Sequence, residues 1–201
     1  MNRLRRWWLG RRYSGGEWGF LFEPPPVGEW VSLDLETTGL DPSRDAVLSL
    51  AAVPVRGGQV RLSERFETLV QPGRGFDIES IRHHRLTPEE VANAPALDAV
   101  LPGFLRWLGP RTLLGHHLAF DLAMIDPAVR RLTGFPLPNP RAELAQAWLD
   151  RRRLEQPQGD IDLSLDTIAR GLGVPVLDRH TALGDASAVG LCWLALAARS
   201  G

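Results

Sequence analysis

The chain has 201 residues, 44% hydrophobic and 23% charged, which is enough for one domain with a packed core. Its formal net charge of -1 provides no overall attraction to nucleic acid, although bound cations can reverse the local sign of a cleft. The single cysteine, Cys192, excludes an internal disulfide and a cysteine-rich zinc site, and no stretch approaches the roughly 20 apolar residues of a membrane span, so we expect a cytoplasmic protein.

Residues 1–27 differ in composition from the rest and are predicted to form a leader ahead of a domain of residues 28–201. They are rich in arginine and tryptophan and end in three prolines, which favour an extended spacer. Arginine mixed with tryptophan suits single-stranded nucleic acid or a membrane surface. Alternatively, the aromatic side chains pack on the domain or on a protein partner.

A sheet is predicted to begin directly after the leader. Val31, Leu33 and Leu35 alternate with polar residues, and this period of two is typical of a strand. Residues 46–55 predict a second strand, and the glycine-rich turn at 56–59 leads to a third near residues 66–70. Residues 112–115 predict a short buried strand.

Most of the predicted helices follow in the second half of the chain. A threonine, a proline and two glutamates at 87–90 are typical of a helix start. Apolar spacing predicts further helices over 97–108, 120–132, 141–154, 165–172 and 182–198, with Pro127 expected to kink or restart its helix. This order predicts an α/β domain with a mixed central sheet, its first three strands antiparallel, flanked by helices.

Asp34 and Glu36 are the first candidate metal ligands. The period of two places both carboxylates on one face of the strand, about 6 to 7 Å apart. Oxygen ligands held on a rigid element suit Mg²⁺ or Mn²⁺. The same acid-x-acid pattern is also common on solvent-facing strands, but the turn at 37–40 would bring backbone close to whatever the metals hold.

Two later clusters supply the remaining candidates. Asp121 lies at a predicted helix start, where an acid also favours the helix dipole. Adjacent His116 and His117 point in different directions on a strand and have no third soft ligand nearby, so zinc is excluded. His180 precedes Asp185 at the last helix, where a neutral imidazole could act as a base beside a metal held by the aspartate.

Together, these clusters resemble the DnaQ-like 3'→5' exonucleases of the DEDDh type, similar to the exonuclease domain of the DNA polymerase III epsilon subunit. The resemblance covers about residues 31–197 and implies a ribonuclease H-like fold. It implies that His180 is the general base and that two Mg²⁺ or Mn²⁺ ions are held by four acids: Asp34, Glu36, Asp121 and Asp185.

The resemblance also implies contacts with the terminal nucleotide. The residues at the matching positions are Thr37, Leu40, His116 and Phe120, and His84 matches a segment that lies near the substrate. Leu40 and Phe120 are candidates for stacking on a base or, alternatively, are core residues. Two departures from the family pattern occur: His117 replaces an asparagine, which is expected to alter the fit to substrate, and Arg85 replaces a glycine in the loop near the substrate.

The resemblance implies hydrolysis of the last phosphodiester at a 3' end, with release of nucleoside 5'-monophosphates. Single-stranded DNA is favoured over RNA, and an RNA-trimming enzyme with the same site is the alternative. The chain ends directly after the predicted last helix, so a stand-alone enzyme, or one tethered to a protein partner through its leader, is expected. The competing hypothesis is that the protein is not an enzyme but a module that binds nucleic acid or protein without catalysis.

Overall fold

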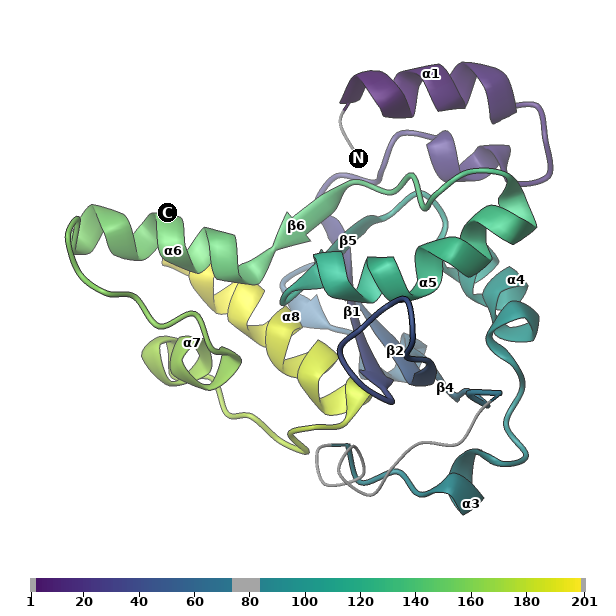
Figure 1. Ribbon diagram of the computed structural model, residues 1–201. Helices are drawn as coiled ribbons and strands as arrows, with labels where there is room; N and C mark the ends of the chain where they lie inside the picture. The colour runs from purple at the N-terminus through teal and green to yellow at the C-terminus, as the bar shows by residue number, and fades with distance from the viewer. Residues whose placement is uncertain (1–2, 74–83, 200–201) are drawn as a thin grey trace.

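The computed structural model describes residues 3–73 and 84–199 and shows a six-stranded mixed sheet with helices on both faces (Figure 1). The strand order is β3-β2-β1-β5-β6, and β4 also pairs with β2. β1 is antiparallel to β2, which is antiparallel to β3 and β4, whereas β1, β5 and β6 run parallel. The strands are β1 (Glu29–Thr37), β2 (Val47–Arg56), β3 (Gln59–Val60), β4 (Phe66–Leu69), β5 (Thr112–Gly115) and β6 (Arg141–Glu143). The predicted mixed sheet is therefore confirmed.

Most helices also lie where the sequence predicts them; the differences are a helix over residues 3–13, which was not predicted, and the structure at residues 141–143 and at Pro127. They are α1 (Arg3–Tyr13), α3 (Pro88–Val91), α4 (Leu97–Leu108), α5 (Leu118–Thr133), α6 (Leu144–Glu155), α7 (Leu165–Leu172) and α8 (Ala182–Ala198), with short 3-10 turns η1 (Gly19–Phe22) and η2 (Leu62–Glu64). The prediction of helix from residue 141 is wrong, because residues 141–143 pair with β5. The helix is also not restarted at Pro127, since α5 continues through it.

The alternation of side chains along β1 divides the interior into two hydrophobic clusters. Val31, Leu33 and Leu35 belong to the cluster that contains the buried side chains of α4 and α5. The second cluster joins β5 to α6, α7 and α8 and includes Cys192, which packs as a small apolar residue, as predicted. α8 lies close to the sheet because Gly190 has no side chain: a Cβ there would be 3.0 Å from a methyl carbon of Val55.

The amino-terminal segment packs against the same interior. Trp18 and Leu21 are buried in the first cluster, and Phe20 contacts it, whereas Trp7 and Trp8 are exposed. The packing alternative therefore accounts for part of this segment, and the domain division at residue 27 remains a prediction. Among the described residues, no helix combines the length and the apolar character that crossing a bilayer requires.

Candidate active site

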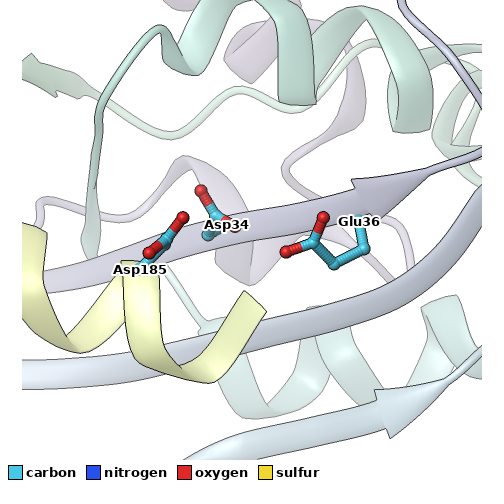
Figure 2. A group of neighbouring side chains, drawn as sticks. All are labelled: Asp34, Glu36 and Asp185. Atoms are coloured by element: carbon cyan, nitrogen blue, oxygen red, sulfur yellow. The ribbon is translucent and has the colours of Figure 1, made fainter. Parts of the chain in front are cut away.

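Three carboxylates from two elements meet at the carboxyl end of β1. Asp34 and Glu36 lie on β1, and Asp185 lies in the first turn of α8. One oxygen of each residue lies within 4.8 Å of an oxygen of the other two. Figure 2 shows the three carboxylates around a common space between the strand and the helix. The structure thus brings together residues that are far apart in the sequence.

An irregularity in β1 follows the second acid. Glu36 pairs with Ser49, but Thr37 pairs with Val47, so the register shifts between Glu36 and Thr37. Bulges of this kind bend a strand and re-aim its side chains, and they are common beside active sites. The next turn is compact: a Cβ at Gly39 would lie 2.5 Å from a carboxylate oxygen of Asp45. A side chain at position 39, three residues after Glu36, would therefore have to displace the Asp45 carboxylate.

The Asp45 carboxylate holds this turn from the inside. The Thr38 hydroxyl donates a hydrogen bond of 3.0 Å to it, and the backbone N–H of Asp41 donates one of 2.8 Å. The Thr37 hydroxyl donates to the Gly39 carbonyl at 2.7 Å. These bonds fix the backbone that presents Thr37 and the exposed Leu40 beside the carboxylates.

The start of α8 positions Asp185. The Thr181 hydroxyl accepts a hydrogen bond of 3.1 Å from the Gly184 N–H, which caps the helix. One Asp185 oxygen, Oδ2, accepts a hydrogen bond from the Arg179 guanidinium. The other, Oδ1, is buried and has no protein hydrogen-bond partner in the described chain. A buried carboxylate oxygen without a partner is costly unless a cation or water binds it.

The pKa values of Asp34 and Glu36 are raised in this site. Burial raises the pKa of Asp34 well above its ordinary value, and the charges of Asp121, Asp185 and Glu36 raise it further. Burial and the Asp185 charge raise the pKa of Glu36 to about 7, against an opposing effect of Arg179. Like charges in a poorly solvated space favour protonation or binding of a cation.

Asp121 is near this group but outside the set of three. It is buried in the first turn of α5, and burial raises its pKa to about 8, while a hydrogen bond from the Leu35 backbone opposes the rise. Its charge is the largest carboxylate contribution to the raised pKa of Asp34, so the two side chains are electrostatically coupled. The structure therefore places the fourth predicted acid beside the site.

His180 lies on the turn that precedes α8, with an exposed side chain. Its φ of +63° is in the left-handed region, as is the φ of +52° at Asp178. The pKa of Asp166 on α7 is lowered first by a hydrogen bond from Arg179, and the positive charge of His180 also contributes. The predicted base is thus on an exposed turn beside α7, outside the group of three carboxylates.

The other predicted substrate contacts differ in burial. Leu40 is 85% exposed, whereas Phe120 packs partly against the first hydrophobic cluster. His84 is buried, and its Nδ1 accepts a hydrogen bond of 3.0 Å from the Leu86 N–H. His116 is half-buried next to His117, and burial, followed by the neighbouring imidazole, lowers the pKa of His116.

Two residues at the site were not predicted from the sequence. Arg179 links the site to α7, because its Nε donates a 2.8 Å hydrogen bond to Asp166 while the same guanidinium binds Asp185. The one sequence feature that could have indicated Arg179 as a site residue is its position directly before His180. Glu143 at the end of β6 accepts hydrogen bonds from the backbone N–H groups of His117 and Leu118, at 2.9 and 3.0 Å, and so fixes the start of α5. Nothing in the local sequence indicates this long-range cap.

The residues present fit divalent metal ions. All candidate ligands are carboxylate oxygens, the donors that Mg²⁺ and Mn²⁺ prefer, and one buried oxygen has no partner in the described part of the protein. The guanidinium of Arg179 contacts the oxygen opposite that unpartnered atom. Arg179 brings positive charge to the cluster, because it lowers the pKa values of Asp34 and Glu36, against the effect of the acids.

Replacing Arg179 by glutamine is expected to lower the melting temperature of the metal-free protein and to enlarge the rise produced by Mn²⁺. The variant leaves Asp185 partly buried without its counter-ion, and the metal no longer competes with the guanidinium. A loss of about 1 kcal/mol corresponds to roughly 2–4 °C in a protein of this size. Thermal unfolding with and without Mn²⁺ measures both effects, and Arg170→Gln on α7 is the control. A rise no larger than that of the native protein would contradict this competition.

Comparison with curated proteins relates this geometry to DNA polymerase III subunits. The chain is 32% identical over 160 residues to the DNA polymerase III subunit epsilon of Aquifex aeolicus, covering 80% of this chain and 76% of that protein. It is 31% identical over 160 residues to the PolC-type DNA polymerase III of Thermotoga maritima, covering 78% of this chain. The chain spans only 11% of the length of that polymerase.

Solved structures support the ribonuclease H-like fold. Escherichia coli exonuclease I in complex with a dT13 oligonucleotide superposes with a TM-score of 0.71 at 17% identity, covering 86% of this chain and 42% of that chain. The family model described as an exonuclease, RNase_T, matches residues 31–190, a range that includes all four predicted acids and His180. The chain therefore belongs to the RNase_T family of DnaQ-like exonucleases.

Proposed function

We propose that this protein is a metal-dependent 3'→5' exonuclease that removes nucleoside 5'-monophosphates from nucleic acid, with single-stranded DNA as its preferred substrate. The observation that carries the proposal is the meeting of Asp34, Glu36 and Asp185 within 4.8 Å, with one Asp185 oxygen lacking a partner in the described chain. Such an arrangement is costly unless the site binds cations. Family membership supplies the reaction class.

The four acids would hold two Mg²⁺ or Mn²⁺ ions, with Asp34 central because it is coupled to the other three. When bound, such ions stabilise the negative charge on the attacking and leaving oxygens of an in-line displacement. β1 holds Asp34 and Glu36 in place, because both residues pair with β2 and the preceding residues 30–32 of β1 also pair with β5. Asp185 contributes from a capped helix.

His180 would accept the proton of the attacking water. Its exposed position on the turn before α8 leaves the imidazole accessible to a bound strand and next to the carboxylates' helix. A general base of this kind accelerates a reaction by about 10²–10⁴-fold. The exposed Leu40 and the partly exposed Phe120 would contact the terminal base, with Thr37, His84 and His116 around the sugar and phosphate.

DNA is preferred in this proposal because the two relatives compared above are DNA polymerase III proteins and the structural neighbour holds a dT13 oligonucleotide. A polymerase is accordingly the first protein partner to examine. RNA remains the alternative substrate, and a cytoplasmic location would give access to either polymer.

The test uses single-stranded DNA and RNA of one sequence, labelled at the 3' or the 5' end, with Mg²⁺, Mn²⁺ or a chelator. The proposal predicts a ladder that shortens from the 3' end of DNA, requires metal, and is absent for Asp34→Ala. Faster shortening of RNA would select the RNA-trimming enzyme. Metal-dependent cleavage of neither polymer would contradict the proposed activity and favour a binding module.

A further inference from the structure

The helix α1 carries a concentration of positive charge and aromatic surface that the proposed reaction does not use. The side chains described from Leu4 to Tyr13 include four arginines and no acid. Trp7 and Trp8 are 56% and 67% exposed, and Leu4, Arg5, Arg11 and Arg12 are exposed as well. Exposed apolar patches rimmed by polar residues mark interaction sites more often than isolated apolar side chains do.

This helix is held firmly on the domain. Nε of Arg6 donates a hydrogen bond of 3.0 Å to the Pro138 carbonyl, and its guanidinium also donates to the Glu23 carbonyl at 2.9 Å. On the inner side, the Tyr13 ring lies 4.9 Å from that of Phe135. The exposed tryptophans therefore lie on a helix that is already fixed to the domain. A ligand that binds them does not have to order this helix, which lowers the entropy cost of binding.

A cavity of about 600 Å³ lies between α1 and η1. The residues that line it include Trp7, Phe20 and Phe22, the two arginines Arg6 and Arg11, and one acid, Glu23. The Arg11 guanidinium lies 5.1 Å from the centre of the Trp7 ring, so a cation and a flat aromatic surface are adjacent. Cavities of this size accept small organic molecules, and a nucleotide is within the range.

We propose that α1 and this cavity form a second binding site, for single-stranded nucleic acid. Arg11 and Arg12 contact phosphates, and Trp7 and Trp8 stack on unpaired bases. Single-strand binding sites combine these two features, because stacking is available from every base and arginine neutralises the backbone. This second site rests on the proposed exonuclease function in one respect, which is that nucleic acid is chosen as the anionic ligand.

A membrane surface fits this helix less well. Helices that lie in a bilayer interface separate a wide apolar face from a charged one. In α1, Trp7 and Arg11 are one turn apart on the same side and are in contact. Trp8 and Arg12 repeat this spacing, so each exposed tryptophan has an arginine on its own side of the helix.

The second site is remote from the carboxylates. The chain passes from α1 through η1 into the beginning of β1 (Figure 1). Asp34 and Glu36 lie near the carboxyl end of that strand. Five to seven residues of strand separate Glu29 from Asp34 and Glu36, which corresponds to roughly 20 Å. A long strand held in the active site can therefore also reach α1, whereas a short strand binds chiefly at one site or the other.

The experiment measures binding of fluorescein-labelled 5- and 30-nucleotide single-stranded DNA to the metal-free protein by anisotropy. Trp7→Ala/Trp8→Ala and Arg11→Gln/Arg12→Gln are expected to weaken binding of the long strand about tenfold or more and binding of the short strand by a smaller factor, because only the long strand engages both sites at once. The arginine variant should reduce the slope of log affinity against log salt by about 1.4, and the tryptophan variant should not.

Arg130→Gln/Arg153→Gln removes two exposed arginines elsewhere and serves as the control with matched charge. Equal long-strand affinity in the native protein and in both α1 variants would overturn the proposal. Tryptophan-dependent binding to anionic phosphatidylglycerol vesicles, with no effect on DNA, would overturn it in favour of a membrane. Long-strand binding through α1 without any cleavage in Mn²⁺ would support the second site and contradict only the proposed activity.

Discussion

Replacing His180 by alanine is expected to lower the rate of cleavage by about a thousandfold, within the roughly 10²–10⁴-fold range of general base catalysis. The same change should leave the rise in melting temperature caused by Mn²⁺ intact. His180 is exposed and lies outside the group of three carboxylates, so its removal takes away a proton acceptor without taking away a metal ligand.

Asp185→Asn provides the contrast, because it should lose both cleavage and most of the metal-induced rise. Single-turnover cleavage of 3'-labelled DNA measures the first effect, and thermal unfolding measures the second. Leu177→Ala alters an exposed side chain in the segment just before His180 and controls for disturbance of the turn. Loss of the metal-induced rise in His180→Ala would show that the histidine is a ligand and not the base.

The free energy of unfolding of the metal-free protein is expected to fall as pH rises from about 5 to about 8. Burial and mutual repulsion raise the folded-state pKa of Glu36 to about 7 and that of Asp121 to about 8, and they raise that of Asp34 well above its ordinary value. Unfolded carboxyl groups titrate near pH 4. The folded state therefore binds more protons across this interval, and the stability present below pH 4 is lost as these groups ionise.

Saturating Mn²⁺ should remove this dependence and raise the melting temperature at pH 8, because the metal binds the ionised native site. Asp34→Asn should raise the metal-free melting temperature at pH 8 by several degrees while abolishing cleavage, since 1 kcal/mol corresponds to roughly 2–4 °C. Thermal unfolding from pH 5 to 8.5 measures these effects, with the exposed Asp160→Asn as control. A metal-free stability that is constant or rises over this range would contradict the coupling among the acids.

The sheet and the acids of β1 could be predicted because their signals are local. The alternation of Val31, Leu33 and Leu35 fixes which face of the strand Asp34 and Glu36 share, whatever the rest of the chain does. β6 was missed because it is three residues long and exists only through pairing with β5. Three residues are too few to show the alternation of a strand, and here pairing with another strand decides the local structure in place of the sequence pattern.

Contacts between distant segments could not be predicted in the same way. The guanidinium of Arg179 bridges α7 and α8, and Glu143 caps a helix 25 residues earlier in the chain.

The structure gives a physical reason for the family pattern at the two positions that depart from it, His117 and Arg85. Both residues have φ values near +60°, where asparagine and glycine are favoured. The family's preference for asparagine and glycine at these positions is therefore explained by backbone conformation before any contact with substrate is considered.

The close packing of α8 on the sheet also determines when the site can exist. A nascent chain completes β1, with Asp34 and Glu36, early in synthesis, but Asp185 follows only with the last helix. Joining these segments closes a long loop, which costs chain entropy. The packing of α8 on β1 and β2 offsets this cost. A chain that still lacks α8 therefore has Asp34, Glu36 and Asp121 without Asp185, and nuclease activity reports that the whole domain has finished folding.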